Sequence, residues 1–294
     1  MGLRTPYFAG TWYPGSRNEC LRTIKEYEAD LPPGAIQEVG KLTEAGWRGG
    51  IVPHAGWYFS GKTAYSVFYR IHAVTSYRGK MPDTFFIFGM HLGPGSPNYI
   101  FLDEGFQTPL GTIEVNLKVA ELLSSSFNFY REDSRNYTPD NTIELQLPFL
   151  KYLFPDATVV TVGASPGPNA FAIGEKAAQI SEELGFETIF IGSTDLTHYG
   201  PNYGFTPQGT GPKSVRWVNE ENDRRIIEAF LRVDFQGVLR EALVSRNACC
   251  PGAAAAALAA VKKLGAEKGE LVYYTTSYDI HPDSSFVGYA GVVY

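Results

Sequence analysis

The chain has 294 residues, of which 44% are hydrophobic and 19% are charged, a balance that is typical of a folded globular protein and excludes a disordered chain. A formal net charge of -6 and the lack of any run of Lys or Arg argue against nucleic acid as a partner. No apolar stretch approaches the roughly 20 residues that a membrane-spanning helix needs, so we expect no membrane span.

Short β-rich apolar runs alternate with longer helical patterns from one end of the chain to the other. The alternation predicts an α/β fold, one layered domain over residues 1–294 in which helices flank a central, mostly buried sheet. In chain order the expected elements are helix 19–29, strand 50–52, helix 62–74, strand 84–88, helix 116–124, strand 158–162, helix 170–184, strand 188–191, helices 220–230 and 253–264, and strands 271–275 and 287–294.

Three of the five histidines stand just after a predicted strand, each with a glycine close by. His54 follows strand 50–52, His91 follows strand 84–88, and His198 follows strand 188–191. Ligands of open α/β sheets gather where strands end and loops begin, so these imidazoles could converge on one site. A single histidine at a strand end is more often structural, and spacing alone does not name a set of ligands.

Two acidic residues accompany these histidines. Asp195 lies three residues before His198 and could orient that imidazole, contact a metal or cap a turn. Asn141 followed by Glu144 matches a helix capping box, which explains Glu144 without a role in a pocket. The Gly- and Pro-rich stretch 199–212 after His198 is interpreted as a loop that lines a pocket.

Cysteine is rare in the chain, and its placement is informative. The chain has three cysteines, Cys20, Cys249 and Cys250. An odd and small number of thiols implies no disulfide framework and favours a reducing, cytoplasmic location. Cys250 precedes a predicted helix, where the helix dipole favours the thiolate that binds metals or attacks electrophiles. For Cys249 the simpler interpretation is a small hydrophobic residue in the core.

Eight short segments in order resemble the Memo family, which is similar to the class III extradiol ring-cleaving dioxygenases. They are GTWYP at 10–14, PHAGWYFSG at 53–61, FGMH at 88–91, TPLG at 108–111, IELQLPF at 143–149, STDLTHYG at 193–200, NACC at 247–250 and SSFVGYA at 284–290. The resemblance covers nearly the whole chain and implies a central sheet flanked by helices, with a pocket at the strand ends.

The resemblance also implies a metal held by two histidines and a cysteine, which match His54, His91 and Cys250. Fe(II) is the expected metal, with copper or zinc as alternatives because a thiolate softens the site. His198 matches the acid/base residue of the ring-cleaving enzymes, and Asp195 matches its neighbour. The expected substrate contacts are Trp57, Asn141, Glu144 and Tyr199.

The chain departs from the family pattern at two of these positions. Asn141 stands where the family commonly has histidine, and an amide cannot shuttle a proton at neutral pH. Pro251 directly follows the two cysteines, which leaves open whether Cys249 or Cys250 faces the metal.

Three functions follow as hypotheses. The first is a dioxygenase-type oxidoreductase that acts on a small organic substrate, aromatic compounds included. The second is a metal-handling or peptide-binding adaptor that uses the same pocket, with a protein partner or a second copy of the chain. The third is metal-free nucleophilic chemistry by Cys250 and His198.

Overall fold

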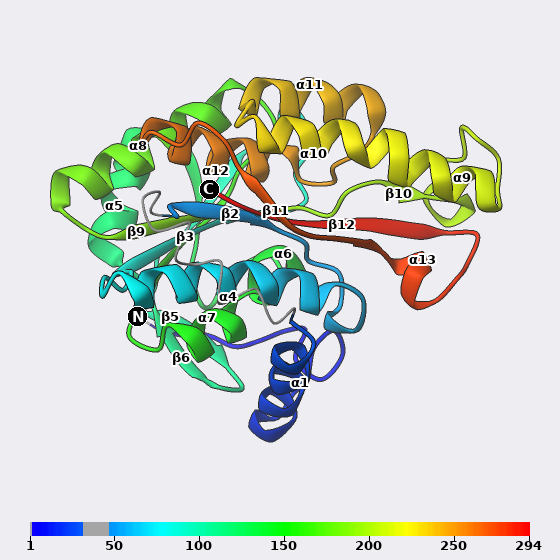
Figure 1. Cartoon of the computed structure of the whole chain (residues 1–294). Helices are drawn as coiled ribbons and strands as arrows, with labels where there is room; N and C mark the ends of the chain where they lie inside the picture. Colours follow the sequence, from blue (N-terminus) through cyan, green and yellow to red (C-terminus); the bar gives the residue numbers. More distant parts are fainter. Residues whose placement is uncertain (1, 32–46) are drawn as a thin grey trace.

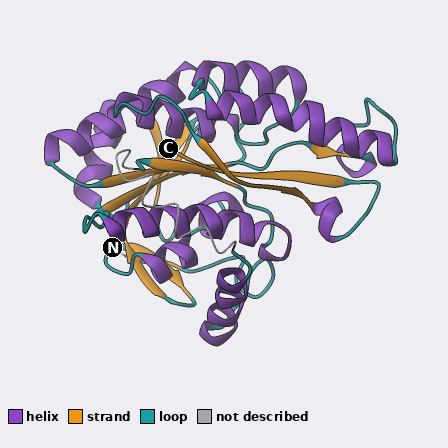
Figure 2. Ribbon diagram, viewed as in Figure 1, coloured by secondary structure: helices purple, strands orange, loops and turns teal. Residues whose placement is uncertain are grey.

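The computed structural model describes residues 2–31 and 47–294. Within them, a mixed nine-stranded sheet lies between two layers of helices (Figure 1 and Figure 2). The path of the sheet is β10-β12-β2-β9-β3-β8-β4-β7, and β11 pairs with β12. The strands are β2 (Gly49–Val52), β3 (Thr84–Gly89), β4 (Asn98–Phe101), β7 (Phe129–Glu132), β8 (Thr158–Gly163), β9 (Thr188–Ser193), β10 (His198–Tyr199), β11 (Glu270–Thr276) and β12 (Phe286–Val293).

The four central strands β2, β9, β3 and β8 run parallel to one another. Every residue of β3 and β9 is buried, which confirms the prediction of a mostly buried central sheet. Since parallel strands end at the same edge of a sheet, the loops after β2, β9 and β3 start side by side. The predicted site residues lie in the loops at that edge.

Helices cover both faces of the sheet. On one face α12 packs against β2, β3 and β9 and lies beside α8 and α11, while α4 packs on the other face against β2, β11 and β12 (Figure 1). The helices are α1 (Arg17–Ala29), α4 (Lys62–Tyr77), α5 (Leu117–Ser126), α6 (Asn141–Glu144), α7 (Leu147–Leu153), α8 (Pro168–Leu184), α9 (Pro212–Trp217), α10 (Asp223–Leu231), α11 (Phe235–Ser245), α12 (Pro251–Lys263) and α13 (Ser277–Ile280).

Small residues let α12 approach its neighbours closely. From Pro251 to Val261 all of its residues are buried, and seven of them are alanine. A Cβ on Gly174 of α8 would lie 2.0 Å from the Ala256 carbonyl oxygen, so α8 and α12 touch through their backbones. A Cβ on Gly252 would likewise lie 2.3 Å from the Ala164 oxygen. This close packing brings the start of α12, and the two cysteines before it, to the carboxyl edge of the sheet.

The prediction of an α/β protein with a central sheet flanked by helices is confirmed, and each element expected from the sequence is present with ends that differ by at most three residues. The structure adds elements that the sequence analysis did not identify. These include β4 and β7 at one side of the large sheet, helix α11, and a small sheet of β1 (Leu3–Arg4), β5 (Gly105–Thr108) and β6 (Gly111–Glu114).

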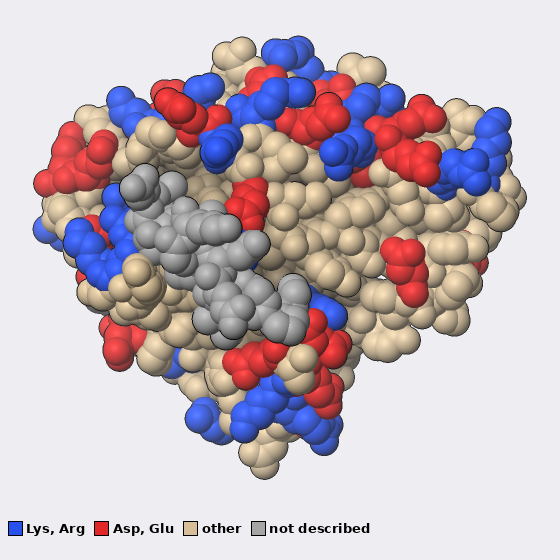
Figure 3. All heavy atoms as spheres, viewed as in Figure 1, with Lys and Arg blue, Asp and Glu red and all other residues tan. Residues whose placement is uncertain are grey.

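Charges of both signs are interspersed on the helical surface. Along the upper edge of the face in Figure 3, where α10 and α11 lie, Lys and Arg side chains stand next to Asp and Glu side chains. Ion pairs such as Arg225–Glu241, 2.9 Å apart, and Arg224–Glu228, 3.7 Å apart, account for part of this mixture. Among the residues that the structure describes, no helix has both the length and the apolar character needed to cross a bilayer.

Candidate metal centre and pocket

Three loops deliver the site residues from adjacent strands. His54 lies two residues after β2, His91 two residues after β3, and Asp195 two residues after β9. Because β9 lies between β2 and β3, the two histidines flank Asp195 at one edge of the sheet. The order of the strands, rather than any sequence spacing, brings these side chains together.

Four side chains of the types that ligate metals meet at this edge. One ligand atom from each of His54, His91, Cys249 and Cys250 lies within 4.8 Å of the ligand atoms of the other three. The ring centroids of His54 and His91 are 4.9 Å apart, with the rings at 82° to each other. Imidazole nitrogen and thiolate sulfur suit iron, copper or zinc, so this set of donors fits the transition metal that the resemblance implies.

Hydrogen bonds to the His54 backbone and to its ring nitrogen Nδ1 fix the position of this residue. Its Nδ1 lies 3.0 Å from Ser193 Oγ, which leaves Nε2 directed at the sulfur of Cys249, 3.2 Å away. Asp195 Oδ1 accepts a hydrogen bond from the His54 backbone N–H at 2.7 Å, and the Asn141 amide donates one to the His54 carbonyl at 2.8 Å. Contacts of this kind orient metal-binding imidazoles.

The His91 ring has an equivalent partner in Asp140. Asp140 Oδ2 lies 3.1 Å from His91 Nδ1 and accepts the His91 backbone N–H at 3.2 Å. Burial opposes charge on the ring, but the hydrogen bonds of Asp140 and Cys249 outweigh it and raise the pKa of His91 to about 10. Met90, just before this histidine, has a φ of 72°, and its N–H donates to Thr142 Oγ1 at 2.7 Å. This unusual turn aims His91 at the cluster.

The two cysteines occupy different positions in the cluster. Cys249 Sγ is 3.2 Å from His54 Nε2 and accepts the Asp195 N–H at 3.3 Å, whereas its distance to Cys250 Sγ is 3.7 Å. Burial disfavours the Cys249 thiolate, but contacts with Cys250, His54 and His91 prevail, and its pKa lies well below the usual value. Burial and the neighbouring Cys249 raise the pKa of Cys250. The interpretation of Cys249 as a core residue therefore misses its contact with His54, and the predicted ligand Cys250 lies beside it.

A pocket of about 560 Å³ opens over this centre. Four of the five histidines of the chain line it, namely His54, His91, His198 and His281. Asp195, Asp283 and Asn141 add polar groups, and no Lys or Arg is among its described lining residues. Its aromatic lining consists of Trp12, Tyr58, Phe59, Tyr203 and Tyr289.

His198 lies on the pocket wall with one ring nitrogen already engaged. Its Nδ1 is 3.2 Å from the Leu196 carbonyl oxygen, which can only accept a hydrogen bond, so Nδ1 carries the proton and Nε2 is the basic nitrogen. The edge of the ring meets Tyr203, with centroids 4.9 Å apart. The buried Asp195 is bonded to the backbone of His54 and Ala55 rather than to His198.

Of the four expected substrate contacts, only Asn141 lines the pocket. Trp57 is buried, stacks on Phe149 and donates through Nε1 to the Leu145 carbonyl oxygen. Tyr199 is fully buried, and its hydroxyl donates to the Gly209 carbonyl oxygen. The assignment of these two side chains to a substrate pocket needs correction, because both are held in the core.

Glu144 also points away from the pocket. Its carboxylate accepts the backbone N–H groups of Tyr7 and Phe8 at 3.0 and 2.7 Å and the Tyr13 hydroxyl at 3.2 Å. The predicted capping box is also corrected, because Asp140 and not Asn141 caps α6 through the Thr142 N–H. Glu144 therefore anchors the segment 7–13, whose Thr11 and Trp12 reach the pocket.

Comparison with known proteins agrees with this architecture. The family model described as Memo-like protein matches residues 4–293. The chain belongs to the Memo-like family. A MEMO1 family protein of Thermococcus onnurineus is 32% identical over 301 residues, covering 99% of both chains. Another from Pyrococcus furiosus is 31% identical over 300 residues, covering 99% of this chain and 98% of that one.

A solved structure shows a similar fold. The crystal structure of an uncharacterized protein from Escherichia coli K12 superposes with a TM-score of 0.53 at 12% identity, covering 83% of this chain and 98% of that one. The likeness supports the layered fold of this Memo-like chain.

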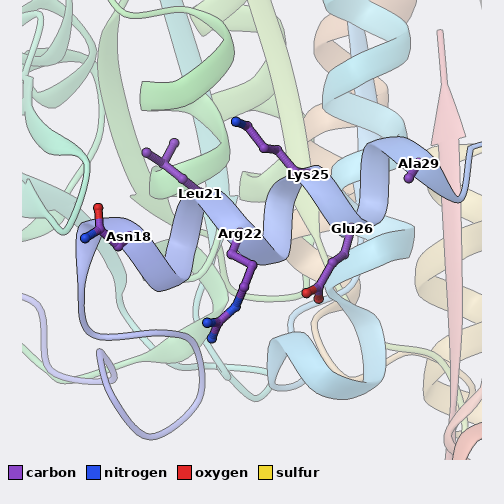
Figure 4. A pocket seen from close by; sticks show the side chains of 6 residues that line it. All are labelled: Asn18, Leu21, Arg22, Lys25, Glu26 and Ala29. Carbon is purple, nitrogen blue, oxygen red and sulfur yellow. The ribbon is translucent and has the colours of Figure 1, made fainter.

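Another hollow, of about 450 Å³, lies along α1 (Figure 4). All of its lining residues belong to this one helix, and they include no His, Cys or Asp: they are Asn18, Leu21, Arg22, Lys25, Glu26 and Ala29. It lacks the converging His and Cys donors of the site at the strand ends.

A buried carboxyl beside the site makes stability depend on pH. Asp223 accepts hydrogen bonds from the Thr197 N–H and the Tyr274 hydroxyl, but burial outweighs them and raises its pKa to about 6. The unfolded chain releases this proton near the ordinary Asp pKa of about 3.9. Between these values only the folded state keeps the proton, so the stability contributed by Asp223 falls as pH rises through the window and is constant above it.

We therefore expect the variant Asp223→Asn to gain stability relative to the wild type as pH rises from about 4 to about 6, by up to about 3 kcal/mol. Urea unfolding of both proteins across this window measures the difference. A difference that stays constant with pH would contradict the assignment.

Proposed function

We propose that this Memo-like protein is a non-haem, metal-dependent oxidoreductase of the dioxygenase type that acts on a small organic substrate. The observation that carries the proposal is the convergence of two oriented imidazoles and a thiol pair beneath a pocket lined by a further histidine, His198. Two features support it, the set of metal ligands and the character of the pocket.

His54, His91 and Cys249 would hold the metal. Cys249 is preferred over the predicted Cys250 because its sulfur contacts His54 Nε2 at 3.2 Å and its pKa is lowered, whereas that of Cys250 is raised. Fe(II) is the proposed ion, with copper or zinc as alternatives for the same donors. When bound, Fe(II) would supply one-electron chemistry toward O2.

The pocket residues would bind the substrate and move its protons. Trp12, Tyr58 and Tyr203 offer ring surface to a flat molecule, and the absence of Lys and Arg from the described lining disfavours a highly anionic one. The Asn141 amide nitrogen is committed to the His54 carbonyl, which leaves its oxygen to accept a substrate hydroxyl. His198 Nε2 would take a proton from that hydroxyl and return it to the product.

The absence of Lys and Arg from the described lining of the pocket also weakens the alternative of a phosphopeptide adaptor, because phosphopeptide-binding sites recognise phosphate through Arg clusters.

Oxygen uptake by anaerobically Fe(II)-loaded protein, with a panel of catechols and aminophenols, tests the proposal. We expect His198→Gln to lower kcat by about 10²- to 10⁴-fold, the usual contribution of a general acid/base, while Fe(II) binding is kept. His72→Gln is the matched control, because His72 lies on α4 against Phe154 and outside the pocket. No oxygen uptake across the panel, or full activity of His198→Gln, would contradict the proposed function.

A further inference from the structure

Cys249 and Cys250 form a pair of adjacent thiols whose second member has no role in the proposed function. Both are free, and their sulfurs are 3.7 Å apart. Cys20, the remaining thiol of the chain, is buried and bonded to the Pro14 carbonyl oxygen. The two sulfurs are therefore close enough to react with each other after a small rotation of either side chain.

The surroundings of the two sulfurs differ in a way that suits two chemical roles. Cys249 Sγ has the Asp195 N–H at 3.3 Å and the His54 ring nitrogen at 3.2 Å, and such donors stabilise a thiolate. Cys250 is 2% exposed, and within the described part of the chain its sulfur has Cys249 Sγ as its one hydrogen-bond partner. One sulfur is thus prepared as a nucleophile, and the other is shielded and faces it.

Small molecules can approach the first of these sulfurs. Cys249 is partly exposed, and its neighbours His54 and His91 both line the pocket of about 560 Å³. A molecule as small as hydrogen peroxide fits this space easily. Cys250 is buried, and its sulfur contacts that of Cys249.

We propose that Cys249 and Cys250 are a site of reversible oxidation by hydroperoxides, which join them in a vicinal disulfide. The Cys249 thiolate attacks one peroxide oxygen, the O–O bond breaks, and Cys249 becomes a sulfenic acid while the other oxygen leaves as hydroxide or alkoxide and takes up a proton. The Cys250 thiol then attacks the Cys249 sulfur, and water leaves as the S–S bond forms. The two sulfurs together lose two electrons, and the peroxide gains them.

Geometry makes this disulfide easy to reduce. Consecutive Cα atoms are about 3.8 Å apart across a trans peptide, shorter than the roughly 4.4 to 6.8 Å that unstrained disulfides prefer. Strained disulfides have more oxidising potentials and are the labile ones. A dithiol should therefore restore both thiols.

Oxidation would also change the metal centre, and this consequence rests on the proposed function. A disulfide sulfur is no longer a thiolate, so the centre would keep only the His54 and His91 nitrogens. We expect the oxidised protein to lose its metal and the reduced protein to bind it again.

Mass spectrometry of metal-free protein tests the oxidation independently of any metal or activity. After a short treatment with hydrogen peroxide, the wild-type tryptic peptide 247–262 should be lighter by two hydrogen atoms, and dithiothreitol should reverse the change. In Cys250→Ser, Cys249 should instead gain oxygen, and dimedone should trap the resulting sulfenic acid. Once Cys249 is overoxidised, dithiothreitol should no longer restore it. Cys20→Ser is the matched control and should behave like the wild type.

Gain of oxygen by the wild-type peptide in place of the loss of two hydrogen atoms, or an unchanged wild-type mass, would overturn the proposal. The measurement on the wild-type peptide tests the proposal even if Cys250→Ser does not fold. Metal content, measured before and after peroxide, is a separate readout. A reversible disulfide in a protein that never binds metal would refute the metal centre and leave the oxidation site standing.

Discussion

His54→Ala is expected to weaken metal binding at least about 100-fold, because even residues that only orient metal ligands contribute about 10- to 100-fold to affinity. His54 Nε2 faces the thiol pair, its ring is held by Ser193 at Nδ1, and its backbone is held by Asp195 and Asn141. Alanine would remove one of the two imidazoles and leave the cluster with His91 and the sulfurs. His91→Ala should have a similar effect.

Anaerobic competition of the protein with a chromogenic chelator for Fe(II) or Zn(II) measures this loss. His72→Ala is the control, since it removes an imidazole from α4 away from the cluster. Circular dichroism of each variant verifies the fold. Unchanged affinity in a folded His54→Ala protein would exclude a metal centre at this position.

The same titration distinguishes the two sulfurs. Cys249→Ser should cost more affinity than Cys250→Ser, because the Cys249 sulfur is the one in contact with His54. In Co(II)-substituted protein, the sulfur-to-metal charge-transfer band should disappear in the first variant and persist in the second. The reverse order would return the ligand role to Cys250.

Glu144→Ala is expected to lower the free energy of unfolding by about 3–5 kcal/mol, the usual loss when one partner of a buried ion pair is removed. The carboxylate accepts hydrogen bonds from the Tyr7 and Phe8 N–H groups and the Tyr13 hydroxyl, and Arg4 Nη2 lies 4.0 Å away. Both charged groups are buried. Alanine would leave three hydrogen-bond donors without their acceptor and would remove a carboxylate that interacts with the buried Arg4 charge.

Urea unfolding of the variant measures the loss. Glu144→Gln should lose less, because it keeps an oxygen that accepts hydrogen bonds. Glu228→Ala is the matched control, since the exposed ion pairs of Glu228 with Arg224 and Arg232 predict a change within about 1 kcal/mol. A raised KM with unchanged stability in Glu144→Ala would instead support the substrate contact that the sequence suggested.

Local patterns in the sequence were sufficient for the elements of the central fold. Strands 84–88 and 188–191 are unbroken apolar runs and appear as β3 and β9, buried along their whole length. The alanine-rich run 253–264 appears as α12. Such patterns reflect which residues are buried, and they repeat with the period of a strand or a helix. They can therefore be recognised without knowing which residues lie nearby in space.

The roles of several side chains could not be predicted in this way. Trp57 and Glu144 lie in motifs next to site residues, yet one side chain stacks on Phe149 and the other anchors the backbone of Tyr7 and Phe8, more than 130 positions away in the chain. Proximity in sequence does not fix the direction of a side chain, because successive side chains on a helix or strand point in different directions.

By itself, the sequence determined which segments become the central strands β2, β3, β8 and β9 and that histidines stand at strand ends. Only the tertiary structure decided that β9 lies between β2 and β3, so that His54 and His91 meet, and that Cys249 rather than Cys250 contacts the His54 ring. The physical reason is that both outcomes depend on long-range packing. The order of strands in the sheet and the close approach of the alanine-rich α12 set these distances, and neither is encoded in the spacing of the ligands along the chain.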